Sequence, residues 1–329
     1  MRTLNRRTLL KAGTLAVLST PYLARPAIAQ TTITVASLLG EDKPETKIWR
    51  FLAEKAEERL PGRFRFNIVT NGALGGEKQV ADGIRLGAVQ ASLSTVSALS
   101  AWVPELQLLD LPFLFRSPEH LRRVVTGPVG DNLRERLADE RFIVGGFIDY
   151  GARHLLTRTP VTRPEQLEGV TIRVINSPLH TGLWSAFGAV PVGIPITETY
   201  NALSTGVADA MDLTKSAYAG FKLYEVVPCL TETGHIRASG VIYFSEGLWN
   251  GLDPETQGLL MEISAEAALY FNALIVEDET AAMQTARENG GEVFQPEDMD
   301  AWRAGARGVW AEFAPAVGGM ERIEMIENG

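Results

Sequence analysis

Residues 141–160 constrain the fold most strongly, because they are extended over a length that the sheet of one domain seldom uses. Three apolar β-type runs, at 142–144, 147–148 and 155–157, follow one another without a helical period. At about 3.3 Å per residue, fifteen extended residues span roughly 50 Å. A second stretch, 235–244, alternates apolar residues with others. We therefore expect two long strands that each run through two lobes.

These two strands bracket the middle of the chain and divide it. The expected first lobe comprises residues 30–150 and 245–329, and the second lobe comprises 151–244 with the crossing strands. With 329 residues, the chain is longer than one hydrophobic core usually fills. A cleft between two lobes is a common place for a small-molecule site.

The N-terminal part of the chain predicts an α/β layer. Strand and helix patterns alternate there, at 32–36, 48–60, 64–69, 80–88 and 91–95. This order favours a parallel sheet covered by helices. Ligands bind beyond the carboxyl ends of such strands, where Ser94 and Thr95 would lie.

A long helix is expected after Asp253, which has the character of an N-cap and is followed by Pro254 in the first turn. Apolar residues recur at helical spacing over 259–274, and the helical pattern continues to Asn289. At 1.5 Å per residue this is about 50 Å of helix. A helix of that length can lie across both lobes.

The first 29 residues have the pattern of a signal peptide. A basic start with Arg6, Arg7 and Lys11 precedes a short apolar run, and a small-x-small site predicts cleavage near Ala29 and Gln30. The arginine pair fits the twin-arginine pattern, so we expect export into a bacterial periplasm. A membrane anchor is the alternative, but the apolar run is too short to span a bilayer.

Composition and net charge indicate a soluble protein with an acidic surface, which limits the ligands it can bind. Hydrophobic residues make up 45% of the chain and charged residues 22%, as in soluble globular proteins. The first 29 residues hold five basic and no acidic residues, so residues 30–329 carry a formal net charge of −14 rather than −9. Nucleic acid is a poor partner for such a surface. An anionic ligand would have to be captured by a local group of cations.

Neither a disulfide, a metal nor a cofactor is expected. The single cysteine, Cys229, has no partner within the chain, and its apolar surroundings favour a buried small residue over a nucleophile. The four histidines are widely separated, and no pair shows metal-ligand spacing.

Arg173 is the main candidate for ligand binding. It lies in the apolar β-type run 171–176, which would fix a cation near the end of a strand. Arginine stays charged, and its planar fork matches a carboxylate with two parallel hydrogen bonds. Arg153 is a second candidate cation and Asn176 a nearby polar group. The alternatives are interdomain ion pairs for both arginines and a helix-capping role for Asn176.

Several segments together resemble the solute-binding proteins of tripartite ATP-independent periplasmic (TRAP) transporters, the DctP-like family. The resemblance covers residues 31 to about 290. Each segment alone is weak, but their order and spacing are specific. The segments are GALG at 72–75, LPFLF at 111–115, LEGVTIRV at 167–174, GAVP at 188–191, YNALSTGVAD at 200–209 and YEV at 224–226.

The resemblance implies a two-lobed α/β fold like that of periplasmic binding proteins, with crossing strands and a long spanning helix. It also implies that Arg173 pairs with a ligand carboxylate and that Arg153 and Asn176 lie near it. The chain departs from the family pattern at three positions: Leu213 replaces an asparagine, Thr95 a carboxylate and Ile196 an aromatic residue of some members.

These departures predict a less polar pocket and a small or partly apolar organic acid as ligand. Ser94 and Asp212 complete the polar candidates. Tyr218 and Trp184 are candidates for the wall, with core packing as the alternative for both. No residue is expected to be catalytic.

The resemblance further implies that the lobes close on the anion and deliver it to a small and a large membrane subunit. An ABC-type periplasmic binding protein is one alternative. An exported α/β enzyme acting on small carboxylic acids is another, and Asp209 with Asp212 could be read as its acid and base. Against the enzyme, the chain has no Gly-x-Ser-x-Gly elbow and no HExxH motif.

Overall fold

The computed structural model describes residues 30–329, so the predicted signal peptide lies outside the described residues. One sheet of nine strands runs through the described chain, in the order β2-β1-β3-β8-β4-β7-β5-β6, and β9 pairs with β8. The strands are β1 (Thr31–Ala36), β2 (Phe64–Val69), β3 (Ala91–Thr95), β4 (Phe142–Thr157), β5 (Thr171–Val174), β6 (Val190–Gly193), β7 (Ala210–Thr214), β8 (Cys229–Ser245) and β9 (Glu292–Phe294).

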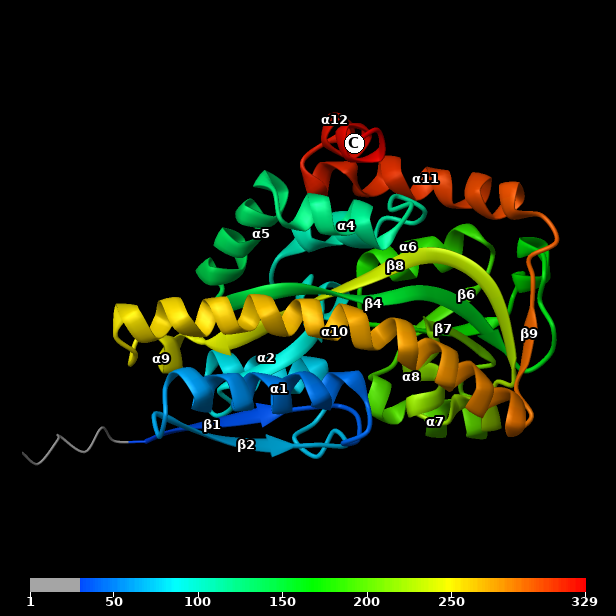
Figure 1. Cartoon of the computed structure of the whole chain (residues 1–329). Coiled ribbons are helices and arrows are strands. Elements are labelled where there is room, and N and C mark those ends of the chain that lie inside the picture. The colour runs from blue at the N-terminus through cyan, green and yellow to red at the C-terminus, as the bar shows by residue number, and fades with distance from the viewer. Residues whose placement is uncertain (1–29) are drawn as a thin grey trace, which may run out of the picture.

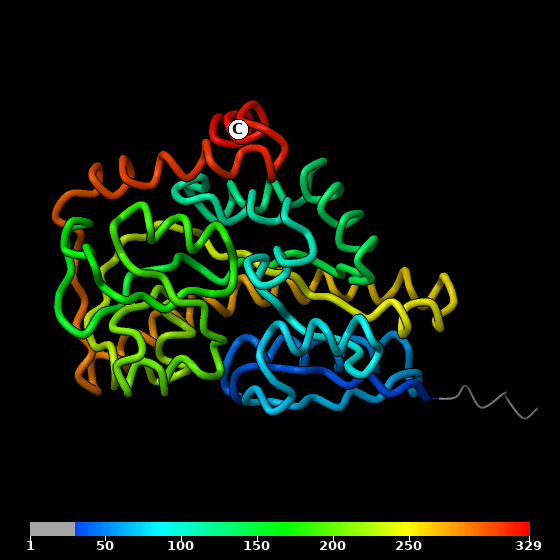
Figure 2. Tube along the Cα trace, turned by 180° about the vertical axis from the view of Figure 1, so that it is seen from behind, coloured from blue at the N-terminus to red at the C-terminus, as the bar shows by residue number. Residues whose placement is uncertain are grey.

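The two long strands join two parallel groups of strands. β1 is parallel to β2 and β3, and β5 is parallel to β6 and β7. Between these groups, β4 and β8 pair with each other antiparallel along most of their length. Seen from behind, the N-terminal layer and the segment that follows β4 lie side by side as two groups (Figure 2). The predicted two-lobed α/β fold with crossing strands is confirmed.

Helices cover both faces of this sheet (Figure 1). They are α1 (Pro44–Arg59), α2 (Glu77–Arg85), α3 (Val96–Leu99), α4 (Pro118–Val125), α5 (Pro128–Asp139), α6 (Pro178–Ala186), α7 (Ile196–Thr205), α8 (Lys215–Gly220), α9 (Glu246–Trp249), α10 (Pro254–Glu288), α11 (Met299–Val317) and α12 (Met320–Glu327), with 3₁₀ turns η1 (Pro104–Asp110), η2 (Pro164–Leu167) and η3 (Leu223–Glu225).

The long helix α10 is the spine of the molecule, as the sequence predicts. The Asp253 carboxylate accepts a hydrogen bond from the Thr256 amide at 2.9 Å and so caps its first turn. The helix packs on α1, β4 and α8 and therefore spans both halves (Figure 1). By length and composition α10 could also cross a membrane, but its apolar stripe with Ile263 and Phe271 is fully buried in the core.

The C-terminal helix α11 differs from the expected division of the chain. The sequence assigned all of 245–329 to the first lobe, and α11 packs both on η1, which belongs to that lobe, and on α6, which belongs to the inserted segment. Trp302 on α11 lies edge-on to Phe187 with ring centroids 5.1 Å apart. The apolar face of α6 is thus covered by a helix that is distant in the sequence.

Candidate functional site

A cavity of about 70 Å³ lies where the two parallel groups of strands meet. Its lining comes from the carboxyl ends of β1, β3 and β7, the first turns of α1, α2 and α7, the helix α8, and the crossing strands β4 and β8. Ligands of open α/β sheets bind at such an edge. The residues that line it are Leu38, Leu39, Glu45, Glu77, Thr95, Tyr150, Arg153, Ile196, Leu213, Thr214, Ala217, Phe221 and Ala238.

Arg153 lines this cavity and is held by a buried carboxylate. Its Nε donates to the Asp212 carboxylate at 2.5 Å, and one of its terminal nitrogens donates to the Asp212 carbonyl oxygen at 2.8 Å. Burial alone would raise the pKa of Asp212, but Arg153 and a hydrogen bond from His235 bring this pKa well below its ordinary value. The pair fixes the guanidinium fork while Asp212 neutralises its charge.

His235 supports the pair from the other side. Burial lowers the pKa of His235, and because the ionised Asp212 can only accept, the neutral ring donates to it from Nε2 at 3.1 Å. The ring's other nitrogen, Nδ1, then accepts from the Thr233 hydroxyl at 2.7 Å. Asp212 therefore does not act as one half of an exposed acid/base pair, since Arg153 and His235 occupy one of its oxygens and its side chain is fully buried.

Three irregularities in the pairing of β4 with β8, two with an extra residue in β4 and one with extra residues in β8, set the direction of the residues at the cavity. The pairing of β4 with β8 shifts between Val144 and Gly146, between Asp149 and Gly151, and between Arg153 and Leu155. A bulge bends a strand and turns the next side chains to a new direction. Tyr150 and Arg153 lie at the second and third bulges, and both line the cavity.

Arg173 is buried close by but does not line the cavity in this structure. It is 2% exposed, and its Nε donates to the Ile194 carbonyl oxygen at 2.8 Å. No carboxylate among the described residues forms an ion pair with it. Burial and the nearby charge of Arg153 lower the pKa of Arg173 to about 10, so the group stays charged at neutral pH. Arg173 thus carries a buried positive charge that forms no direct ion pair within residues 30–329, although the charges of Asp212 and Glu77 act on it from a greater distance.

Glu77 is a carboxylate of the cavity that the sequence analysis missed. Its Oε1 accepts hydrogen bonds from the Thr95 amide at 2.7 Å, the Thr95 hydroxyl at 2.8 Å and the Ser94 hydroxyl at 3.2 Å. Ser94 and Thr95 thus lie at the predicted edge of the sheet, where they position a carboxylate. Acidic residues are common in the first turn of a helix because they stabilise its dipole, so this position alone gave no functional signal.

Glu45 and Tyr150 are further polar groups of the cavity that the sequence analysis missed. Glu45 lies in the first turn of α1, is 8% exposed, and its Oε2 has no hydrogen-bond partner among the described residues. Burial raises the pKa of Glu45 to about 7. Burial and the two glutamates, Glu45 and Glu77, likewise keep the pKa of Tyr150 well above its ordinary value, so its phenol stays protonated.

The remaining predicted residues fall into two groups. Ile196 and Leu213 line the cavity and give it an apolar wall together with Phe221. Tyr218 and Trp184 do not reach it. The Tyr218 hydroxyl donates to the Val227 carbonyl oxygen at 3.1 Å, and Trp184 is fully buried in the core beneath α11.

Asn176 is also placed elsewhere. Its side chain is exposed and lines a separate, open hollow beside Ser177 and Phe313. Nor does it cap α6, because the N-cap position is Ser177. The strand β5 ends at Val174, so Asn176 lies two positions beyond the end of the strand and outside the cavity lining.

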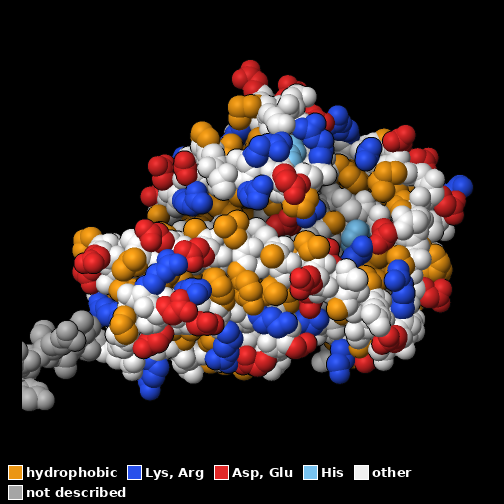
Figure 3. All heavy atoms as spheres, viewed as in Figure 1, with side chains coloured by type: hydrophobic (Ala, Val, Ile, Leu, Met, Phe, Trp, Pro, Cys, Tyr) orange, Lys and Arg blue, Asp and Glu red, His pale blue; other side chains and the backbone are white. Residues whose placement is uncertain are grey.

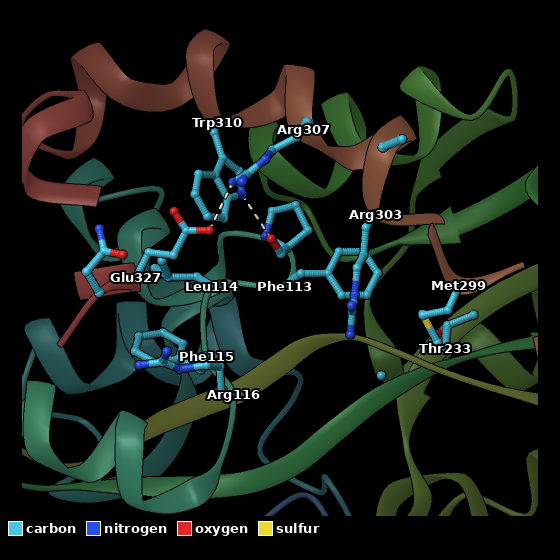
Figure 4. A pocket seen from close by; sticks show the side chains of 14 residues that line it. Phe113, Leu114, Phe115, Arg116, Thr233, Met299, Arg303, Arg307, Trp310 and Glu327 are labelled. Carbon is cyan, nitrogen blue, oxygen red and sulfur yellow. Dashed lines mark hydrogen bonds and ion pairs between the residues drawn. The ribbon is translucent and has the colours of Figure 1, made fainter. Parts of the chain in front are cut away.

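A larger hollow of about 810 Å³ lies below α11 and contains none of the predicted site residues (Figures 3 and 4). Arg303 and Arg307 reach down from α11 toward the loop that carries Phe113 (Figure 4). Arg307 is paired with Glu327 at 3.1 Å, and Trp310 donates from its indole to the Pro112 carbonyl oxygen at 2.9 Å. Size alone therefore does not identify the site, and the converging polar groups lie in the smaller cavity.

No group of three or more metal-ligating side chains occurs within residues 30–329. The arrangement supplies one cation in the cavity lining and a second buried beside it, together with two glutamates and an apolar wall. Such a set can bind and orient a small polar molecule.

Comparisons with known proteins identify the family to which the chain belongs. The family of bacterial extracellular solute-binding proteins, family 7 (DctP), matches residues 35–316. The chain is 30% identical over 247 residues, 75% of each chain, to the 2,3-diketo-L-gulonate-binding periplasmic protein YiaO of Escherichia coli. It is 26% identical over 293 residues to the C4-dicarboxylate-binding periplasmic protein DctP of Shewanella loihica, covering 88% of this chain and 87% of that one.

A solved structure shows the same fold. It is a TRAP periplasmic solute-binding protein from a Bradyrhizobium species in complex with galacturonate. The two are 27% identical, with a TM-score of 0.87 over 91% of this chain and 100% of the other. With the family match across most of the chain, this likeness identifies the protein as a member of the DctP family of TRAP-type solute-binding proteins.

Proposed function

We propose that this protein captures a small organic acid between its lobes and delivers it to the membrane subunits of a TRAP transporter. The observation that carries the proposal is the pair of buried arginines, Arg153 on β4 beside the carboxyl end of β7 and Arg173 near the end of β5. Arg153 lines the cavity, and Arg173 leaves one positive charge uncompensated. A ligand carboxylate would supply the missing negative charge and accept hydrogen bonds from a rigid fork.

The relatives support an acid as ligand. YiaO binds 2,3-diketo-L-gulonate, the Bradyrhizobium protein holds galacturonate, and the Shewanella protein binds C4-dicarboxylates. All three ligands carry at least one carboxylate. The family consists of binding proteins, which favours capture over turnover.

The architecture supports closure of the lobes as the step before delivery. The cavity draws on both parallel groups of strands, and among the described elements β4, β8 and α10 run through both halves. Closure would bend the two crossing strands, whose bulges interrupt their regular pairing. Export through residues 1–29 would place the protein on the periplasmic side, where such a transporter takes up its substrate.

Native mass spectrometry of the freshly purified protein tests the proposed function. The expected result is a co-purified organic acid whose addition to the stripped protein raises its melting temperature. A panel of sugar acids and dicarboxylates that leaves the melting temperature unchanged would contradict the proposal. Release of a chemically altered acid would instead support an enzyme.

A further inference from the structure

We propose that the cavity selects a monocarboxylate that bears hydroxyl groups and rejects a dicarboxylate, because Glu77 places a carboxylate in the cavity that Arg153 lines. This inference rests on the proposed function and adds the chemical class of the acid. It replaces the expectation of a partly apolar acid, which rested on Thr95, Ile196 and Leu213 alone.

The charges around the cavity favour a ligand with a single carboxylate. Asp212 pairs with Arg153, and Arg173, buried beside the cavity, has no directly paired carboxylate among the described residues. Glu77 contributes a negative charge at the same cavity. A second carboxylate on the ligand would therefore meet a carboxylate of the protein, and like charges at close range are strongly unfavourable.

Glu77 is arranged to accept hydrogen bonds from a ligand. Thr95 and Ser94 saturate its Oε1 with three donors and fix the side chain. Its Oε2 accepts no hydrogen bond from the described residues, and Glu77 lines the cavity. A ligand hydroxyl can donate to this oxygen, whereas a second carboxylate of the ligand has no proton to give.

Glu45 provides the independent observation that points to a polar ligand. Its side chain is more than nine-tenths buried, lines the cavity and leaves Oε2 without a partner. Because a buried polar atom without a partner is costly, a ligand that bonds to it gains affinity. With its raised pKa, Glu45 is largely a neutral acid at slightly acidic pH and can both donate to and accept from a hydroxyl.

The polar groups also divide between the two halves of the molecule. Glu45 and Glu77 belong to α1 and α2, beside the parallel strands β1 to β3, whereas Arg173 belongs to β5. A hydroxy acid can therefore place its carboxylate toward β5 and its hydroxyls toward α1 and α2. Such a ligand bridges the halves and favours closure.

Calorimetric titration with D-erythronate and succinate tests the inference, because these probes have the same chain length and differ in hydroxyls and charge. The purified protein is expected to bind D-erythronate at least about a hundredfold more tightly than succinate. Equal or tighter binding of succinate would overturn the inference. Because the chain length that fits is not fixed, D-glucuronate serves as a second hydroxylated monocarboxylate.

Glu77→Gln is the decisive variant. It keeps the shape of the side chain and removes the charge, so the preference for D-erythronate over succinate should fall about tenfold or more. Glu255→Gln, in the first turn of α10 and outside the cavity, should leave the preference unchanged. A preference that is the same in Glu77→Gln and the parent protein would overturn the inference.

A second pair of variants at Glu45 compares a polar with an apolar replacement of similar size. Glu45→Gln retains a donor and should bind D-erythronate within about threefold of the parent protein, whereas Glu45→Met should bind it more weakly by about tenfold. Equal binding by both variants would contradict a polar role for Glu45. If none of the three acids binds the parent protein, the proposed function itself fails, which is a different result from a lost preference.

Discussion

At the residue scale, Arg153 and Arg173 differ in what balances their charge. Asp212 pairs with Arg153 in the protein interior, whereas Arg173 has no carboxylate partner among the described residues. The sequence singled out both arginines through a family resemblance, but it could not tell which one has an internal counter-ion. That distinction depends on β4 and β7 being neighbours, with Leu155 opposite Asp212 in the sheet.

Arg153→Met is therefore expected to destabilise the fold. It leaves the buried Asp212 charge without its partner, which typically costs about 3–5 kcal/mol. Urea unfolding of the ligand-free protein measures this loss. Arg163→Met is the matched control, since the Arg163–Glu297 pair is more than half exposed on both sides and should contribute little to stability. Equal effects of the two substitutions would contradict the assigned role of Asp212.

Glu45 predicts a pH dependence of stability. Burial raises its pKa from 4.5 to about 7, so the folded state holds a proton that the unfolded state has lost between these values. Stability contributed by this group is therefore full below pH 4.5 and is lost as the pH rises through 7. Above pH 8 the burial of an ionised Glu45 costs about 3 kcal/mol.

Glu45→Gln should remove this penalty. Compared with the parent protein, the variant is expected to gain about 3 kcal/mol at pH 9 and little at pH 4.5. Urea unfolding at both pH values gives the difference. A gain that is the same at both pH values would mean that Glu45 is not buried as an acid.

At the element scale, the crossing strands could be predicted and the packing of the C-terminal helices could not. Extended runs of unusual length are visible in the sequence, and β4 covers sixteen residues and β8 seventeen. The partner of α11 depends on which apolar face α6 leaves uncovered, and that is a property of the folded molecule. For the same reason Trp184 could not be assigned from the sequence to wall or core.

Gly240 on β8 lies between β3 and β4 and close to the Tyr150 ring, where there is no space for a side chain. A Cβ at this position would lie 2.4 Å from the Tyr150 ring and 2.6 Å from the Ser94 carbonyl oxygen. Gly240→Ala should destabilise the protein by about 1–3 kcal/mol, because the strands must move apart to admit a methyl group. Displacement of Tyr150 should weaken ligand binding as well.

Gly258→Ala provides the opposite control. Gly258 is exposed within α10, where an added Cβ meets no atom within 4 Å. The substitution should stabilise the protein by about 0.5–1 kcal/mol, because alanine loses less conformational freedom in a helix. Thermal unfolding of both variants checks the contrast, and a tolerated Gly240→Ala would contradict the packing described at β8.

At the scale of the whole molecule, the net charge is negative although the candidate site contains buried arginines. Residues 30–329 carry a formal net charge of −14, and the two arginines at the cavity are almost fully buried. Composition therefore made nucleic acid a poor candidate partner but gave no information on the site. The glutamates of the cavity could not be predicted because each lies in the first turn of its helix, where an acidic residue has an ordinary structural reason.

The central prediction is that Arg173, which forms no ion pair in the ligand-free protein as described, forms one with the carboxylate of the ligand. The most direct measurement is the melting temperature of Arg173→Met with and without a hydroxylated monocarboxylate that stabilises the parent protein. The ligand-free variant should be at least as stable as the parent protein, because the loss of the hydrogen bond to the Ile194 carbonyl oxygen, about 1 kcal/mol, is offset by the removal of a buried charge that forms no ion pair. The ligand-induced rise in melting temperature should disappear. A rise as large as that of the parent protein would contradict the account.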